Sequence, residues 1–279
     1  MDFLRTSYVT ARYSFALLAT SLLPLAAAAA IPTYDFKVVR SYPHDPQAFT
    51  EGLLYRDGFL YESTGLNGKS SIRKVNLETG AILQSKDIPP QYFGEGLTVW
   101  GNALVGLTWQ TQTGFVFDLA TFEMRSQFVY PGEGWGLTQN GKELIMSDGT
   151  ATLRFLDPKT FLEIRRVKVT ADGIAVDQLN ELEVVGDEIF ANIWHTSTIA
   201  RIDPATGKII GWIDLAKLYP AAGKGLNGEN VLNGIAYDAE KTPVRDGQAV
   251  AQAVRNQTGA TQIKRIRQAA TPRSSPTAH

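Results

Sequence analysis

Short runs in which apolar and polar residues alternate make up most of the chain between residues 31 and 238. Clear examples are Phe59–Tyr61, Ile72–Val75, Phe115–Phe117 and Ile199–Ile202. A period of two residues is typical of strands that bury one face, and turn-forming residues interrupt the runs at short intervals. The pattern therefore predicts an all-β protein.

The runs are part of a longer repeat. Phe49–Leu53 (Phe-Thr-Glu-Gly-Leu) is echoed by Phe93–Leu97 (Phe-Gly-Glu-Gly-Leu), and more weakly by residues 134–137, 179–182 and 232–235. The equivalent positions, spaced by 44, 40, 45 and 53 residues, are Gly52, Gly96, Gly136, Glu181 and Gly234. A repeat of roughly 40–45 residues with about four strands is typical of a propeller blade. We therefore predict a five-bladed β-propeller over residues 31–238, because a sandwich or barrel would not explain the near-constant step.

A second motif keeps the same step along the chain. It begins with Asn or Asp, has Thr three residues later, and occurs at Asn76, Asp118, Asp157 and Asp203. An Asn or Asp side chain at such a position accepts hydrogen bonds from the backbone that follows it. Each motif therefore predicts a tight turn. The strand-like run Tyr34–Tyr42, before the first repeat, is placed to close the ring as the outer strand of the last blade.

The residue before each shared glycine position predicts a binding site. It occupies the same place on the innermost strand of every predicted blade, near one mouth of the ring. These residues are Glu51, Glu95, Trp135, Asn180 and Asn233. Carboxylates, amides and an indole are unusual on a purely structural inner strand, so we expect them to line a polar pocket with an aromatic wall.

Residues 1–30 have the organisation of a secretory signal peptide. Arg5 and Arg12 precede an apolar run from Phe15 that ends in the small residues Ala26–Ala30. The run is short for a membrane span, although an uncleaved N-terminal anchor remains the alternative. The chain has no Cys, so the exported domain must depend on its core rather than on disulfides. We expect a periplasmic or extracellular monomer that has no contact with the membrane after cleavage.

Composition excludes several classes of chemistry. The net charge of −1 gives no reason to expect a nucleic-acid partner. Histidine occurs only at His44, His195 and His279, so a multi-histidine metal centre is not expected. A Gly-x-Ser-x-Gly elbow and a Cys nucleophile are both missing. What remains is carboxylate chemistry beside apolar walls.

Aromatic residues are placed to enclose that carboxylate. Phe49 and Phe93 stand two residues before Glu51 and Glu95. Trp109 and Trp194 each follow an inner-strand position by 14 residues, an offset that reaches the next strand and returns to the same end. Enclosure by rings desolvates a carboxyl and raises its pKa toward the range of an acid–base catalyst.

Several motifs together resemble one known family. They are Phe-Gly-Glu-Gly-Leu-Thr (93–98), Leu-Thr-Trp (107–109), Gly-Trp-Gly-Leu (134–137), Ser-Asp-Gly (147–149), Leu-Asn-Glu-Leu-Glu (179–183), Asn-x-Trp (192–194) and Leu-Asn-Gly-Ile-Ala-Tyr-Asp (232–238). In this order and spacing, residues 40–238 resemble the plant and bacterial type of glutaminyl-peptide cyclotransferase. The resemblance implies a five-bladed propeller that converts the N-terminal Gln of peptides or proteins to pyroglutamate and releases ammonia. It also implies chemistry that needs no cofactor, and a structural calcium in plant members.

The resemblance also implies roles for individual residues. Glu95 matches the catalytic glutamate, which moves a proton from the attacking amine to the leaving ammonia. Asn180 matches a residue that orients the reacting amide or binds the oxyanion. Glu51 stands where plant enzymes have Gln, so its role is open. The hydrophobic wall for the substrate corresponds to Phe49, Phe93, Trp109, Trp135 and Trp194.

Residues 239–279 depart from the family. They carry seven Lys and Arg against two Asp and Glu, and they contain no Phe, Trp, Tyr or Leu. The family continues with Gly-Lys-Leu-Trp-Pro, whose lysine belongs to the active site. Reverse translation of Lys241–Gln257, read one nucleotide later, can spell this segment, with its lysine at Gln248.

We therefore predict that residues 239–279 form an aberrant, frameshifted and disordered basic tail, although a natural disordered tail is the simpler alternative. The last blade would then be incomplete, its N-terminal strand would lack a partner, and the chain would be much less active than its relatives. A non-catalytic peptide-binding propeller is the alternative function.

Overall fold

The computed structural model describes residues 29–218, 231–238, 249–254 and 262–272. The predicted signal peptide lies almost wholly outside these ranges, as do Lys241 and Gln248. None of the described residues is helical, so none of these ranges contains a helix long and apolar enough to cross a membrane. The strands below all belong to the unit Ile31–His279.

Antiparallel sheets of four strands, each in sequence order, form most of this unit. The first contains β2 (Thr50–Arg56), β3 (Phe59–Thr64), β4 (Ser71–Asn76) and β5 (Ile82–Asp87). The second contains β6 (Gly94–Trp100), β7 (Ala103–Thr108), β8 (Thr113–Asp118) and β9 (Met124–Val129). The third contains β10 (Leu137–Gln139), β11 (Leu144–Met146), β12 (Thr152–Leu156) and β13 (Glu163–Lys168).

The remaining long strands form one eight-stranded sheet. Its first half is β16 (Leu179–Val185), β17 (Glu188–Ile193), β18 (Thr198–Ile202) and β19 (Ile209–Asp214). Its second half is β1 (Thr33–Pro43), β22 (Gln262–Pro272), β21 (Ala249–Val254) and β20 (Leu232–Tyr237). A small hairpin, β14 (Thr170–Ala171) and β15 (Ile174–Ala175), precedes β16.

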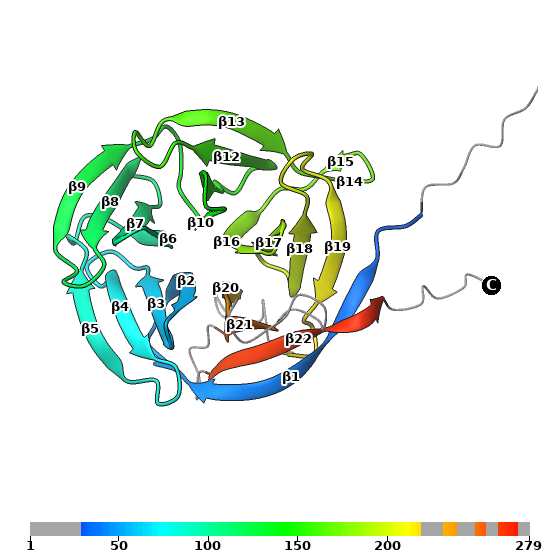
Figure 1. The fold of residues 1–279 in the computed structure, drawn as a ribbon, viewed down its shortest axis with the longest axis horizontal. Helices are drawn as coiled ribbons and strands as arrows, with labels where there is room; N and C mark the ends of the chain where they lie inside the picture. Colours follow the sequence, from blue (N-terminus) through cyan, green and yellow to red (C-terminus); the bar gives the residue numbers. More distant parts are fainter. Residues whose placement is uncertain (1–28, 219–230, 239–248, 255–261, 273–279) are drawn as a thin grey trace, which may run out of the picture. The chain divides into compact units, whose positions relative to one another are not determined.

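The sheets are arranged as the blades of a propeller, which confirms the predicted all-β class (Figure 1). The three separate sheets and the half-sheet β16–β19 make four blades. The inner strands contact one another in the order β2, β6, β10, β16 and β20, and β20 contacts β2. Side chains that lie far apart in the sequence therefore share one inner region.

The repeated glycine is explained by the close approach of neighbouring inner strands. A Cβ atom added at Gly52 would lie 2.5 Å from the backbone nitrogen of Leu97. A Cβ at Gly96 would overlap the backbone nitrogen of Leu137, and the N–H of Gly96 donates to the Trp135 carbonyl at 2.6 Å. Only glycine allows the backbones to come so close.

The predicted turns are confirmed at all four motifs. The Asn76 side chain accepts hydrogen bonds from the N–H groups of residues 78 and 79, both at 3.0 Å. Asp118 and Asp157 make the same pair of bonds, and Asp203 accepts from the N–H of residue 205 at 2.8 Å. Each turn connects the two outer strands of a blade.

The C-terminal segment differs from the prediction. Residues 249–254 and 262–272 are strands β21 and β22, not disordered chain. The predicted strand at 34–42 is β1, but it has partners on both sides. It pairs with β22 in antiparallel fashion and with the end of β19 in parallel fashion. Ladder bonds use backbone groups that every residue except Pro supplies, so a segment without aromatic residues still completes the sheet.

Candidate functional site

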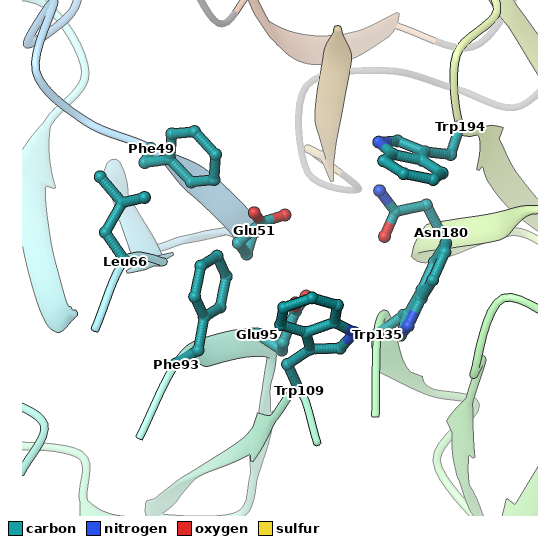
Figure 2. A pocket seen from close by; sticks show the side chains of 9 residues that line it. All are labelled: Phe49, Glu51, Leu66, Phe93, Glu95, Trp109, Trp135, Asn180 and Trp194. Atoms are coloured by element: carbon teal, nitrogen blue, oxygen red, sulfur yellow. The ribbon is translucent and has the colours of Figure 1, made fainter. Parts of the chain in front are cut away.

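Eight of the nine residues predicted to line the site surround one cavity of about 250 Å³. Figure 2 shows their rings and polar groups round a common opening. The lining residues are Phe49, Glu51, Leu66, Phe93, Glu95, Trp109, Trp135, Asn180 and Trp194. Leu66 was not predicted. It lies in the loop between β3 and β4, in left-handed backbone with φ 80°, and no repeat marks that position.

The polar residues of the cavity lie at the starts of inner strands. Glu51, Glu95 and Asn180 lie near the starts of β2, β6 and β16, and they are only 6%, 6% and 5% exposed. Their common position in the repeat brings them to the same end of the ring. A buried carboxyl that faces an apolar cavity is suited to exchange protons with a bound ligand.

Asn233, the fifth predicted position, has a different place. It lies in β20 and is fully buried, and it is not among the residues that line the cavity. Its Nδ2 donates to Glu51 Oε2 at 2.8 Å and to the Thr50 carbonyl at 3.1 Å. Asn233 therefore binds the Glu51 carboxylate from outside the cavity.

The aromatic wall consists of rings in edge-to-face contact. Phe49 and Phe93 have ring centroids 6.0 Å apart, and Phe93 and Trp109 are 5.6 Å apart. On the other side Trp135 and Trp194 are 5.4 Å apart with planes at 80°. This geometry is favourable for aromatic pairs. Two groups of rings thus face the carboxyls.

Backbone hydrogen bonds hold these rings at the mouth. The Trp109 N–H donates to the Phe93 carbonyl at 3.0 Å, so the residue 14 positions after Glu95 returns to the same end, as predicted. The Trp194 N–H donates to the Gln178 carbonyl at 2.9 Å in the same way.

A carboxylate that sequence reasoning missed, Glu133, connects the two groups of rings. Its Oε2 accepts the indole N–H of Trp109 at 2.7 Å and that of Trp135 at 2.9 Å. Its Oε1 accepts from Gln110 Nε2 at 3.2 Å. Desolvation by itself would raise the pKa of Glu133, but these donors lower it on balance. Glu133 lies outside the repeated motifs, and only its position two residues before Trp135 could have indicated it.

A buried ion pair that contacts Thr50, the neighbour of Glu51, was also missed. His44 Nε2 lies 2.8 Å from Glu62 Oε1, and the Thr50 hydroxyl donates to the same oxygen at 2.6 Å. Burial alone would lower the pKa of His44, but the charge and hydrogen bond of Glu62 raise it on balance. Burial would raise the pKa of Glu62, which His44, Thr50 and Arg73 lower. Because Thr50 precedes Glu51, this pair supports the strand that carries a site residue.

No group of three or more His, Asp or Glu side chains within the described ranges is placed to hold a metal ion.

Comparison with known proteins gives consistent matches. The family model described as glutamine cyclotransferase matches residues 12–244. The chain is 46% identical over 210 residues to a glutaminyl-peptide cyclotransferase from Arabidopsis thaliana; the match covers 74% of this chain and 66% of that protein, just under two thirds. It is also similar to the crystal structure of Myxococcus xanthus glutaminyl cyclase. That match has a TM-score of 0.74 and 33% identity, and it covers 85% of this chain and 97% of the other.

Proposed function

The chain belongs to the glutamine cyclotransferase family, and from this we propose that it cyclises the N-terminal glutamine of peptides to pyroglutamate and releases ammonia. The observation that carries the proposal is the position of Glu95. This carboxyl is 6% exposed at a cavity whose other lining residues are mostly Trp and Phe. A glutamine side chain is small, neutral and amphipathic, so it fits a cavity of about 250 Å³ with such walls.

In the proposed reaction Glu95 transfers one proton from the attacking nitrogen to the leaving nitrogen. Its carboxylate takes a proton from the neutral α-amine of the substrate as the nitrogen attacks the γ-carboxamide carbon. The new C–N bond closes the five-membered ring, and the carbonyl oxygen gains negative charge. Glu95 then gives the proton to the departing nitrogen, the old C–N bond breaks, and ammonia leaves. A proton shuttle of this kind contributes roughly 10²–10⁴-fold to a rate.

Asn180 is proposed to stabilise the charge that develops on the oxygen. Its amide lies at the cavity beside Trp194 and across from the carboxyls (Figure 2). An amide N–H can donate to an oxyanion, and removal of one such donor typically costs about 10²–10³ in kcat. Glu51, held by Asn233, is placed to attract the substrate ammonium. We propose that this chemistry uses only side chains of the chain and requires no cofactor.

The finer architecture and the location are also proposals. We propose that β20, β21, β22 and β1 are the fifth blade; the contacts of β20 with both β16 and β2 support this. The signal-peptide pattern of residues 1–30 supports export to the periplasm or the extracellular space. A monomer with no nucleic-acid partner agrees with the weak net charge.

One observation favours a second function, that of a non-catalytic peptide-binding propeller. The Gly-Lys-Leu-Trp-Pro segment does not occur in this sequence, and Gln248 stands where its lysine is expected. Loss of a cationic group from the site would leave the aromatic cavity able to bind a peptide without turning it over.

The test is ammonia release from a Gln-initiated dipeptide by the parent chain and by Glu95→Gln. We expect the variant to lose roughly 10²–10⁴-fold in kcat, while Glu123→Gln, which neutralises an exposed carboxylate on the blade surface, matches the parent. A fully active Glu95→Gln would refute the assigned proton shuttle. A parent that binds the dipeptide in calorimetry but releases no ammonia would favour the second function.

A further inference from the structure

Two indole rings of the cavity direct their N–H groups to one carboxylate outside it. Trp109 follows β7, and Trp135 precedes β10, so the rings belong to different blades. Both donate to Oε2 of Glu133, at 2.7 and 2.9 Å. A single oxygen atom thus connects the Phe93–Trp109 side of the aromatic wall with the Trp135–Trp194 side.

The connection matters most for Trp109, because packing alone does not fix this ring. Trp109 is 37% exposed and touches Phe93 along one edge. An indole on an exposed loop can populate more than one staggered rotamer. A hydrogen bond to a charged acceptor is about twice as strong as a neutral one, so Glu133 selects the rotamer that closes the cavity.

The loop that carries Glu133 is itself fixed. Gly132, just before it, has φ 82°. A Cβ at Gly134 would overlap the Tyr130 side chain, and the Gly134 N–H donates to the Trp109 carbonyl at 2.9 Å. The backbone is therefore constrained on both sides of Glu133, and from there its side chain reaches both indoles.

Glu133 also has the charge that this role needs. The indole N–H is a donor only, so its partner must accept. Desolvation opposes ionisation, but the hydrogen bonds from Trp135, Trp109 and Gln110 hold the pKa of Glu133 below its ordinary value. The side chain is therefore an anion throughout the neutral range.

We propose that Glu133 is a positioning residue that sets the separation and angle of the two aromatic walls, and thereby the affinity of the cavity for the glutamine side chain. It acts through the indoles and does not touch the reacting atoms. The part of this inference that concerns substrate rests on the proposed function. The part that concerns the rings does not.

The experiment compares Glu133→Ala with Glu133→Gln, which keeps an acceptor oxygen, and with Glu123→Gln as the matched surface control. The chain has five Trp, so ¹⁵N-labelled tryptophan gives five indole signals, assigned by single Trp→Phe variants. We expect Glu133→Ala to shift the Trp109 and Trp135 signals and leave those of Trp100 and Trp212 in place. Glu133→Gln keeps an acceptor oxygen but not the charge, so it should shift both signals less than Glu133→Ala does.

The kinetic result should separate positioning from catalysis. A wall that binds ground state and transition state equally affects KM alone, and loss of about one strong hydrogen bond corresponds to roughly a tenfold change. Glu133→Ala should therefore raise KM about tenfold with kcat within about twofold of the parent. Glu133→Gln should raise KM less than Glu133→Ala does. A fall in kcat at constant KM, or unchanged indole signals in Glu133→Ala, would overturn the proposal.

Two further measurements keep the test independent of folding and of the proposed function. In the parent, the Trp109 indole hydrogen should exchange with water at least several-fold more slowly than that of free tryptophan, although the ring is exposed; equal rates would refute the hydrogen bond. If the parent has no cyclase activity, the proposed function fails. The indole shifts and the affinity for a Gln-initiated dipeptide still decide whether Glu133 positions the walls.

Discussion

Replacement of Glu183 by Gln should remove a pH dependence from the stability of the fold. Glu183 lies in β16 and is half-buried. Its Oε1 accepts the Tyr237 N–H at 3.1 Å, and its Oε2 accepts the Thr138 hydroxyl at 3.2 Å. Burial outweighs these hydrogen bonds and raises the pKa of Glu183 from 4.5 to about 8. The carboxyl is therefore protonated in the folded protein at pH values where it is charged in the unfolded chain.

The direction of the effect follows from proton linkage. Below the unfolded pKa, the carboxyl carries its proton in both states and costs nothing. As pH rises from 4.5 to about 8, the unfolded chain releases a proton that the folded chain retains, so stability falls. One proton corresponds to about 1.4 kcal/mol per pH unit, and the whole window to about 5 kcal/mol. Gln keeps the shape and an acceptor oxygen but has no proton to lose.

The assay is urea unfolding of the parent and of Glu183→Gln between pH 4 and 9. We expect equal free energies of unfolding near pH 4 and a growing advantage of the variant, toward about 5 kcal/mol, as pH approaches 8. Glu123→Gln, a change on the exposed surface, should follow the parent curve. Parallel curves for parent and Glu183→Gln across the window would show that the buried carboxyl is already ionised, and the reasoning would be wrong.

Two more substitutions test the site's supports. A Cβ atom at Gly65 would lie 2.6 Å from Cζ of Phe93, so Gly65→Ala should displace that ring and raise KM for a Gln-initiated dipeptide by about tenfold. The control is Gly106→Ala, whose added Cβ has its nearest contact at 3.6 Å and should leave KM unchanged. Equal KM values in the two variants would contradict the close fit at Gly65. His44→Ala removes the cation beside the buried carboxylate of Glu62 and should cost about 3–5 kcal/mol in urea unfolding. The double variant His44→Ala/Glu62→Gln should recover part of this loss, and a single variant as stable as the parent would mean that the pair is not ionised.

Features that recur with the blade could be predicted from the sequence. The turn at Asp118 and the inner-strand position of Glu95 follow from the repeat, because each blade reuses the same backbone geometry. The 14-residue offsets placed Trp109 and Trp194 for the same reason. Knowledge of one blade then predicts the others, and residues at one repeat position meet at one end of the ring.

Features that occur once could not be predicted in this way. Glu133, His44 and Leu66 reach their partners through loops whose geometry no other blade repeats. The pairing of β1 with β22 escaped prediction for a different reason. Backbone ladders leave little trace in side-chain composition, so a segment without aromatic residues was expected to be disordered.

The fourth repeat shows how a departure from a pattern can be informative. Glu181 stands where the four other repeats have glycine, and it is fully buried. Its Oε1 accepts the Leu53 N–H of β2 at 3.1 Å, and its Oε2 accepts the Ile235 N–H of β20 at 2.7 Å. Burial, followed by the charges of Glu183 and Glu51, raises the pKa of Glu181 well above the ordinary value. A glycine would complete the repeat in the sequence but would take this acceptor from two buried N–H groups on two other strands. A buried donor without a partner costs about 1–3 kcal/mol. Glu181, which breaks the repeat in the sequence, therefore stabilises the contact of β16 with the inner strands β2 and β20.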